Sequence, residues 1–493
     1  MKNVPKVRRL LFCWLLLMLL STSASWAQGQ EYTLKQAIDY ALQNRASLKT
    51  LRNQEKIDKA KVGEVRAIGL PQVNAAVDIS HNYIPQKSKV DFGDLGGGGQ
   101  LNDFTITREQ IEGNQDIVLT PTYTVPEGMS GPQILSFTQP WSGNAVLSGS
   151  QLLFDGSYLI GLKAASTYTQ LSRKNTQQGE IEVAEQVSKA YYSVLVANEQ
   201  IKLLDQNLSR LDTLLRQTVI MNKNGFVEKL DVDRLRVSLN NLKIDRDRAQ
   251  RLHELGEQLL KFQMGLPQDQ PITLADQLNE STLATAAPKS NANGFNYASR
   301  IEYSILETQR DLALLSQRNI KSGYLPRLVL TGAYGYNSNE SSFANLAKVR
   351  ASKSAGINRT WFDYGVVGLG LQVPIFDGLR KSYQIQQSKL QLENVKLGFE
   401  QLQQAIDLQL RQSDVTVTNT LSVLRAQRQN MELAEEIARV SRIKYQEGVG
   451  SNLEVITAET DLRAAQTNYY TALYDALIAQ VDADRATGAL LLK

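Results

Sequence analysis

The chain has 493 residues, with 54 Lys and Arg against 50 Asp and Glu, two His and one Cys. The segment 1–27 contains four of the basic side chains, none of the acidic ones and the only cysteine, Cys13. Once this segment is removed, the remaining basic side chains equal the acidic ones in number, at 50 each. A cysteine-free chain of that length excludes disulfides, thiolate metal sites and cysteine nucleophiles.

The segment 1–27 has the pattern of a cleavable secretory signal peptide. Basic residues precede an apolar run at 10–20, and the small residues Ser25 and Ala27 occupy the −3 and −1 positions of a cut after Ala27. Cys13 lies inside the apolar run, which makes it a poor lipidation site. No later stretch reaches the roughly 18 apolar residues that a spanning helix needs. We therefore expect the exported chain to enter a membrane only as part of a β-barrel.

Short motifs recur in order along the chain and indicate an internal duplication. The tripeptide Phe-Asp-Gly at 154–156 recurs at 376–378, and the turn at Gly225 recurs at Gly448, with almost the same offset. Ordered recurrence at one spacing is the signature of a repeated structural unit. The predicted domains are repeat 1 at 28–266, an equatorial linker at 267–296 and repeat 2 at 297–493.

Each repeat begins with a helical pattern, at about 32–68 and at about 297–322, and Gly69 and Gly323 are placed to end these helices with positive φ. Alternating apolar and polar residues then predict two strands per repeat, at about 72–80, 144–153, 328–336 and 362–373. Soluble sandwiches contain similar strands, but nothing else in the chain looks β-like, and aromatic residues gather near the strand ends. A membrane sheet is therefore favoured.

The apolar period changes to heptads after Asp155 and Asp377, which are both good N-cap residues. The first heptad helix is expected at about 157–222, a length on the order of 100 Å at 1.5 Å per residue. Gly225 and Gly448 provide C-cap signals for the two long helices. Shorter return helices are predicted at about 228–264 and 451–487.

Four strands cannot close a barrel, and open strand edges in lipid leave costly unpaired backbone groups. Two copies would give an eight-stranded barrel filled by side chains, whereas three give a twelve-stranded barrel with a lumen. The helices carry polar residues on two faces, as a wall with water on both sides requires. An ordinary coiled coil would also explain the heptads, although not the strands. The predicted fold class is an α+β membrane protein with an internal duplication: a long α-helical coiled-coil barrel plus four transmembrane β-strands per chain, which contribute to a shared twelve-stranded trimeric barrel.

The order and spacing of these motifs resemble the TolC-like outer membrane efflux proteins, or outer membrane factors, over essentially the whole chain after Ala27. The resemblance implies a homotrimer in the lipid of the outer membrane, with its helical barrel in the periplasm. It also implies a passive exit duct for an inner-membrane pump, joined through a periplasmic adaptor (membrane fusion) protein. The alternatives are the exit channel of a type I protein secretion system and, less favoured, a structural periplasmic coiled-coil protein.

The resemblance also assigns functional residues to the two turns between the long and return helices. It places the adaptor contacts at these tips, with the candidates Gly225, Leu230, Val232, Gly448, Ser451, Leu453 and Val455. It places the pore constriction just beyond, with the candidates Glu454, Asp231 and Tyr445. The chain departs from the family at Thr457, where some members have a second acidic ring, and at Gly450, where an Arg can latch neighbouring helices. Glu454 is equally explained as half of a capping box with Ser451.

The remaining sequence features do not indicate a catalytic, metal-binding or nucleic-acid-binding site. His81 and His253 are far apart, no metal-ligand spacing or catalytic constellation occurs, and we expect neither enzyme activity nor a cofactor. The three arginines at 246, 248 and 251 cluster on a helix with Asp245 and Asp247 interleaved, which indicates a solvated helix face and no nucleic acid site. The insertion at 84–140 is expected to be an extracellular loop, either a mobile loop or a surface cap.

Overall fold

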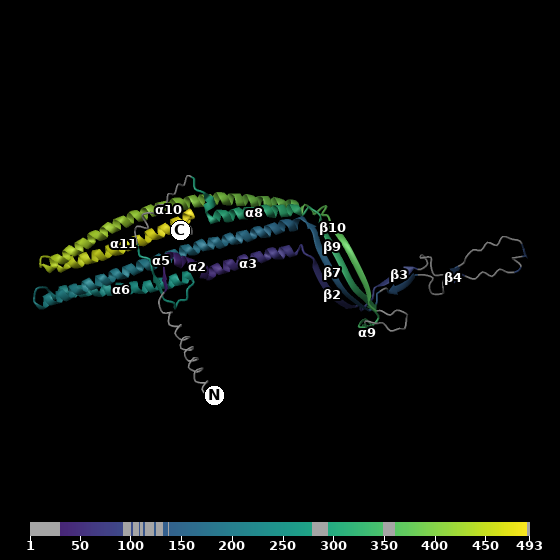
Figure 1. Cartoon of the computed structure of the whole chain (residues 1–493), viewed down its shortest axis with the longest axis horizontal. Helices are drawn as coiled ribbons and strands as arrows, with labels where there is room; N and C mark the ends of the chain where they lie inside the picture. Colours follow the sequence, from purple (N-terminus) through teal and green to yellow (C-terminus); the bar gives the residue numbers. More distant parts are fainter. Residues whose placement is uncertain are drawn as a thin grey trace, which may run out of the picture. The chain divides into compact units, whose positions relative to one another are not determined.

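The computed structural model describes residues 30–91, 100–101, 108, 112–113, 123–124, 132–136, 138–278, 294–348 and 360–490. The predicted signal peptide at 1–27, most of the insertion at 84–140 and half of the predicted linker lie outside the described residues. The chain divides into two compact units (Figure 1). One contains Met1–Glu64, Ile160–Lys321 and Gly378–Lys493, and the other contains Val65–Leu159 and Ser322–Asp377. Each unit therefore combines segments of both predicted repeats.

Four long helices dominate the fold and confirm the heptad prediction. α5 spans Gly156–Lys223 and α10 spans Arg380–Gln446, with 68 and 67 residues. The return helices α6 (Lys229–Met264) and α11 (Asn452–Thr487) have 36 residues each. Figure 1 shows α6 folding back along α5 and α11 folding back along α10, so that each repeat contributes one helical hairpin. Among the described residues, no helix is both long and apolar enough to cross a membrane.

The single first helix predicted at 32–68 is wrong. The segment forms a short strand β1 (Gln30–Tyr32), then α2 (Leu34–Asn44) and α3 (Ala46–Ala67). The two helices are separated by Arg45, whose backbone is extended at φ −61° and ψ 128°. The return helix packs against this break, because a Cβ at Gly265 would lie 3.0 Å from the Arg45 Cα atom. Repeat 2 has the one-turn 3₁₀ helix η1 (Tyr297–Ser299) before α8 (Ile301–Ser322).

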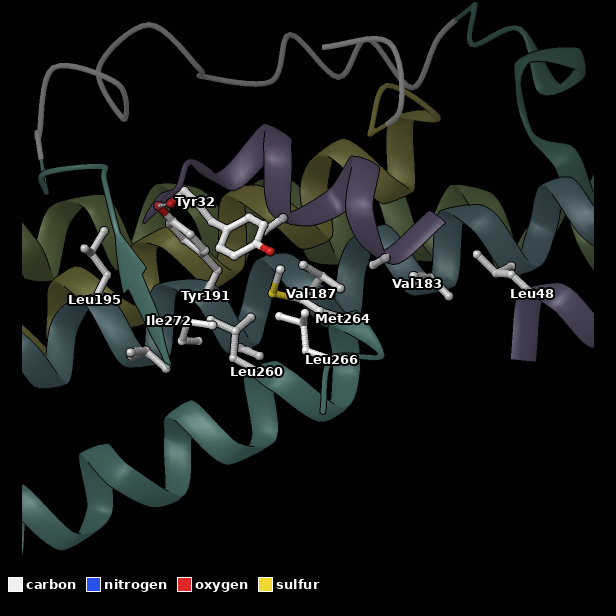
Figure 2. Close-up of a cluster of buried hydrophobic side chains, with 14 residues drawn as sticks. Tyr32, Leu48, Val183, Val187, Tyr191, Leu195, Leu260, Met264, Leu266 and Ile272 are labelled. Atoms are coloured by element: carbon white, nitrogen blue, oxygen red, sulfur yellow. Dashed lines mark hydrogen bonds between the residues drawn. The ribbon is translucent and has the colours of Figure 1, made fainter. Parts of the chain in front are cut away.

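The start of repeat 1 is attached to the linker by backbone pairing and by a shared core. β1 pairs in parallel with β8 (Ile272–Leu274). Buried side chains from this pair, α2, α3, α5, α6 and the linker form one cluster (Figure 2). Tyr191, which is fully buried on α5, bonds through its hydroxyl to the Tyr32 carbonyl at 3.0 Å and to the Asp276 carboxylate at 2.8 Å. Burial first, and then the bond to Asp276, raises the pKa of Tyr191 above its ordinary value.

A four-stranded antiparallel sheet contains the four predicted strands. They are β2 (Gln72–His81), β7 (Trp141–Asp155), β9 (Arg327–Glu340) and β10 (Phe362–Gln372), in the order β10-β9-β7-β2. Cross-strand partners share a face. Val77 pairs with Ala145, which pairs with Tyr336, and this face is mainly apolar. Asn144 pairs with Asp78 and with Asn337, and this opposite face is mainly polar.

The expectation that nothing else in the chain is β-like is wrong. Besides β1 and β8, the insertion contributes β3 (Lys87–Asp91), which pairs with β6 (Pro132–Ser136). It also contributes the two-residue strands β4 (Gln100–Leu101) and β5 (Tyr123–Thr124), which pair with each other. The shorter connection in repeat 2 contains a one-turn helix, α9 (Phe343–Leu346). These strands are too short for periodicity in the sequence to reveal them.

Glycine conformation confirms one set of predictions and corrects another. Gly225 and Gly448 have φ values of 82° and 76°, as expected for glycines that end long helices. Gly69 and Gly323 are not among the described residues with positive φ, so that expectation is wrong. Gly69 instead packs closely against Tyr158, so a larger residue there would require the Tyr158 side chain to move.

Candidate functional site at the two hairpin tips

The first tip connects α5 to α6 through a turn that the backbone itself stabilises. Gly225 takes the left-handed conformation, and the Phe226 amide donates to the Met221 carbonyl at 3.0 Å. The Asn222 side chain donates to the Val227 carbonyl at 2.8 Å. Glu228 is the N-cap residue of α6 but makes no side-chain cap bond. The turn therefore leaves its side chains on the surface.

The second tip, between α10 and α11, follows the same path with different capping. Gly448 is again left-handed, and the amides of Val449 and Gly450 both donate to the Lys444 carbonyl at 3.0 Å. Ser451 caps α11 by accepting from the Glu454 amide at 3.1 Å. A Cβ at Gly450 would lie 2.9 Å from the Lys444 Cβ atom, so the turn would have to shift to hold any larger residue there.

Glu454 forms only half of the predicted capping box. Its amide donates to Ser451, but its carboxylate accepts from Lys444 Nζ at 3.2 Å. Both side chains of this ion pair are almost half exposed, which limits its contribution to stability. The carboxylate therefore lies on the surface of the second tip, beside a lysine.

Asp231 and Tyr445 lie between the two hairpins. The Tyr445 side chain is buried, and its hydroxyl lies 3.2 Å from the Thr218 hydroxyl on α5. The Asn452 side chain donates to the Asp231 carbonyl at 2.9 Å and to its carboxylate at 3.1 Å. Each of the two candidates thus joins one hairpin to the other within a single chain.

The adaptor candidates separate into surface and core residues. Leu230 and Leu453 are 52% and 56% exposed, whereas Val232 and Val455 are buried, and Val455 belongs to a cluster that both hairpins share. The most exposed apolar side chains at the tips, Phe226 at 77% and Val449 at 76%, were absent from the sequence prediction. The sequence does contain their signal, since each is the large apolar residue directly after a turn glycine. We call the exposed residues Phe226, Leu230, Val449 and Leu453 the tip patch.

The sequence profile that describes outer membrane efflux proteins matches residues 37–252 and 307–489. The chain belongs to the outer membrane efflux protein family. It is similar to the outer membrane protein TolC of Vibrio cholerae, with 22% identity over 356 residues, which cover 70% of this chain and 77% of that protein. It is also 24% identical to the outer membrane efflux protein BepC of Brucella suis over 357 residues, which cover 71% and 73% of the two chains.

A solved structure supports the same fold. The outer membrane protein VceC of Vibrio cholerae matches with a TM-score of 0.63 at 15% identity, covering 94% of this chain and 98% of that one. The family match and the relatives make this chain an outer membrane efflux protein that acts as a passive exit duct, and the solved structure shows the same fold.

The outer membrane efflux protein contains depressions along its helices that are lined by both polar and apolar side chains. One of about 490 Å³ lies between the two hairpins and is lined by residues that include Asn207, Asp245, Arg463 and Gln466. Asp245 and Arg463 bridge the hairpins with an ion pair of 3.0 Å. In the part of the chain that the structure describes, no group of three or more His, Cys, Asp or Glu side chains could hold a metal ion.

Proposed function

We propose that three copies of this chain form the exit duct of a tripartite efflux system. Each copy is exported by a signal peptide cut after Ala27, contributes four strands to a twelve-stranded barrel in the outer membrane, and extends its helices into the periplasm as an α-helical barrel. An inner-membrane pump and a periplasmic adaptor protein deliver the substrate. The duct itself conducts passively.

The main support for this proposal is the four-stranded sheet. Its outer strands are β2 and β10, and neither has a second strand partner among the described residues. One of its faces is mainly apolar, and Val77 on that face is 71% exposed. Open edges and an exposed apolar face are tolerated in lipid only when further strands close the sheet. Pairing β2 of one copy with β10 of the next closes twelve strands with three chains and leaves a lumen lined by the polar face.

The helices support the same assembly. Val237 and Ile244 on α6 are seven positions apart and 59% and 63% exposed, and Leu408 and Val415 on α10 are seven positions apart and 67% and 66% exposed. Heptad spacing is the pattern of a helix that packs against another helix. These two stripes belong to different hairpins, so a head-to-tail contact between copies would bury both, and such contacts generate a ring when the rotation between copies closes.

Crosslinking tests the proposed ring. Val77→Cys on β2 is combined with single cysteines scanned along β10, and the matched control scans β9 instead. We expect oxidation to link separate chains into trimers with the β10 scan, because β2 and β10 meet only between copies. Native mass spectrometry of the detergent extract is expected to show three copies. Monomers in detergent, or links between chains that favour β9, would contradict the trimer.

At the tips, the tip patch is the proposed adaptor contact. Four exposed apolar side chains at turns that repeat in both hairpins offer a surface for a second helical protein. Gly225, Gly448 and Ser451 shape the turns, while Val232 and Val455 support them from the core. Replacing Phe226 and Val449 by Ser should weaken adaptor crosslinking without changing the assembly of the duct.

Glu454 is proposed to line the pore constriction, with Asp231 and Tyr445 positioning the helices around it. Three carboxylates around one axis favour cations. In planar bilayers, Glu454→Gln should lower the ratio of cation to anion permeability several-fold relative to Glu436→Gln, whose carboxylate is exposed and bonded to Arg439. Equal ratios in the two variants would rule out this role.

Efflux is preferred over type I protein secretion, because the relative from Brucella suis is itself named an efflux protein. Deleting the gene should raise the cellular accumulation of small dyes while leaving secreted proteins unchanged. The opposite result would favour the secretion channel. If the protein were instead a structural periplasmic coiled coil, it would be recovered in the soluble fraction without detergent.

A further inference from the structure

The helices α5 and α11 come from different repeats and pack against each other in one antiparallel register. Three contacts define it: Glu185 with Arg485 at 2.5 Å, Lys189 with Asp482 at 2.6 Å and Asn207 with Gln466 at 2.9 Å. From one contact to the next, the residue number on α5 increases and the residue number of the partner on α11 decreases by nearly the same amount. All three contacts are therefore consistent with one antiparallel alignment of the two helices. Between the polar contacts the interface is apolar, with Val196, Leu473, Ala476 and Leu477 in one buried cluster.

An apolar heptad interface by itself does not fix one alignment of two helices, because registers that differ by seven residues bury the same kinds of side chain. Sliding one helix by a heptad brings apolar positions opposite apolar positions again, so packing alone discriminates weakly between such registers. The two polar contacts at the ends of the cluster are different, since a buried polar group that loses its partner is strongly destabilising. They can therefore select one register.

Asn207 and Gln466 oppose a slide in one direction. Their side chains are only 5% and 8% exposed, the Asn207 amide donates to Gln466 Oε1, and Asn207 Oδ1 accepts from Arg210. A heptad slide that moves the second tip outward would place Asn207 opposite Leu473 and Gln466 opposite Leu214. Both of these leucines are buried, so neither amide would have a hydrogen-bond partner there.

Glu185 opposes a slide in the other direction. In that slide, Asn207 would meet Glu459 and Gln466 would meet Gln200, so polar partners would be available for both amides. Glu185, however, would move from Arg485 to Ile478. The Glu185 side chain is 11% exposed and is bonded to both Arg485 and Lys189. The slide would separate Glu185 from Arg485 and leave it only Lys189, which lies on its own helix, so the inward register is less favourable than the native one.

We propose that the buried amide pair Asn207–Gln466, together with the ion pair Glu185–Arg485, sets the register of the two repeats and thereby the relative height of the two hairpin tips. These four are positioning residues, since they lie away from the tips and act through α5 and α11. A one-heptad error would displace the second tip from the first by about 10 Å along the helices. The tip patch would then no longer present its two halves at one level.

Spin labels on the tips test this placement directly. Phe226→Cys and Val449→Cys carry the labels, and Cys13 is the only native cysteine, within the predicted signal peptide. The labelled chain is diluted with unlabelled chain so that each assembly contains one labelled copy. Pulsed electron resonance then gives the distance between the tips in the native background, in Asn207→Leu/Gln466→Leu, and in the exchanged pair Asn207→Gln/Gln466→Asn.

The two variants differ in what they remove. The leucine pair fills the site with apolar groups, also removes the acceptor of Arg210, and is expected to add a second population of tip distances, shifted by up to about 10 Å. The exchanged pair keeps an amide opposite an amide and is expected to restore the single native distance. A single native distance in the leucine pair would overturn the proposal.

If the Asn207→Leu/Gln466→Leu variant does not fold, the exchanged variant Asn207→Gln/Gln466→Asn tests the proposal. A single native distance there supports an amide pair as the positioning device, and a broadened distribution refutes it. The readout measures the chain alone, so it stands or falls separately from the pump, the adaptor and the efflux function proposed above.

Discussion

The two repeats follow one plan but begin their helices with different chemistry. In repeat 1, Asp155 caps α5, because its carboxylate accepts from the amides of Ser157 at 2.7 Å and Tyr158 at 3.1 Å. In repeat 2, α10 begins at Arg380, beyond Asp377, and its N-cap residue Leu379 makes no side-chain cap bond. The prediction that Asp377 caps α10 is therefore wrong. The same tripeptide, Phe-Asp-Gly, produces two different helix starts.

The glycine of each tripeptide accounts for part of this difference. A Cβ at Gly156 would lie 2.7 Å from a Leu325 methyl group, so Gly156 provides close packing at the first residue of the helix. Gly378 has open space around it but a φ of 67°, and Leu379 follows with a φ of 64°. The glycine of the repeated motif thus allows close packing in repeat 1 and a left-handed backbone conformation in repeat 2.

In the return helices, the side-chain cap occurs in repeat 2 and not in repeat 1. Ser451 caps α11 in repeat 2, whereas Glu228 makes no side-chain cap bond to α6 in repeat 1. The first helices differ again. The α2 amide of Leu34 donates to Asp276 of the linker at 2.7 Å, while α8 has its own acidic residue, Glu302, in its first turn. Helix starts are therefore where duplicated sequences can diverge without changing the fold.

The largest effect is expected at the start of α5. Asp155→Ala removes two cap bonds and the carboxylate that lies 3.7 Å from Arg327, and should lower the free energy of unfolding by about 1–2 kcal/mol. Asp155→Asn keeps an acceptor and should lose less than half as much. Chemical denaturation followed by circular dichroism measures both. Equal losses would mean that the charge, and not the cap bonds, stabilises this start.

At the tips, removing the cap of α11 should matter more than removing its counterpart. Ser451→Ala is expected to cost about 1 kcal/mol, because the Glu454 amide loses its acceptor. Glu228→Ala, the matched control, should change stability by less than about 0.5 kcal/mol, since Glu228 makes no side-chain cap bond. Hydrogen exchange of the first turn of each return helix reports the difference locally. Equal protection losses would show that the two tips are energetically alike.

Replacing Leu379 by Gly should stabilise the protein. A leucine in the left-handed region is strained by about 1 kcal/mol relative to glycine, and Leu379 has a φ of 64°. Ser157, the corresponding residue in repeat 1, lies inside α5, so Ser157→Gly should destabilise. The midpoint of thermal unfolding measures both changes. A lower midpoint for Leu379→Gly would show that its side-chain packing outweighs the backbone strain.

The smallest effect concerns the pH dependence of the first helix of repeat 2. Burial works against the charged form of Glu302, but its bonds from Arg300 at 3.1 Å prevail and hold its pKa below the ordinary value. A lowered folded pKa stabilises the protein above the unfolded pKa, about 4.3, and this contribution is lost as the pH falls through the folded pKa. Glu302→Gln should therefore flatten the decline in stability below about pH 4.5. An unchanged slope of midpoint against pH would exclude this pair as a contributor.

Much of the helical architecture could be predicted from the sequence. The long helix expected at 157–222 is Gly156–Lys223, and the return helix expected at 451–487 is Asn452–Thr487. Heptad periodicity and a glycine that must be left-handed are local signals, so they survive without knowledge of the partner. The strand at 72–80 could be predicted because alternation with a period of two is also local.

The candidate site was only partly predictable. Val232 and Val455 carry the same apolar pattern as Leu230 and Leu453, but only the folded structure shows that the first pair is buried and the second exposed. Phe226 and Val449 were missed because a surface apolar residue in a turn has no periodicity to mark it. Lys444 was missed because it meets Glu454 only once the turn brings the two helices together.

By itself, the amino-acid sequence determined the long heptad helices, the turn glycines and the two-faced strands, since each depends on spacing along one segment. Tertiary structure decided the break at Arg45, the pairing of β1 with the linker, the uncapped start of α10 and the polar contacts that align α5 with α11. For the pairing of β1 with the linker and the alignment of α5 with α11, the physical reason is the same. Backbone and buried polar groups take the partner that the folded chain places within hydrogen-bond distance, and that partner lies far away in the sequence.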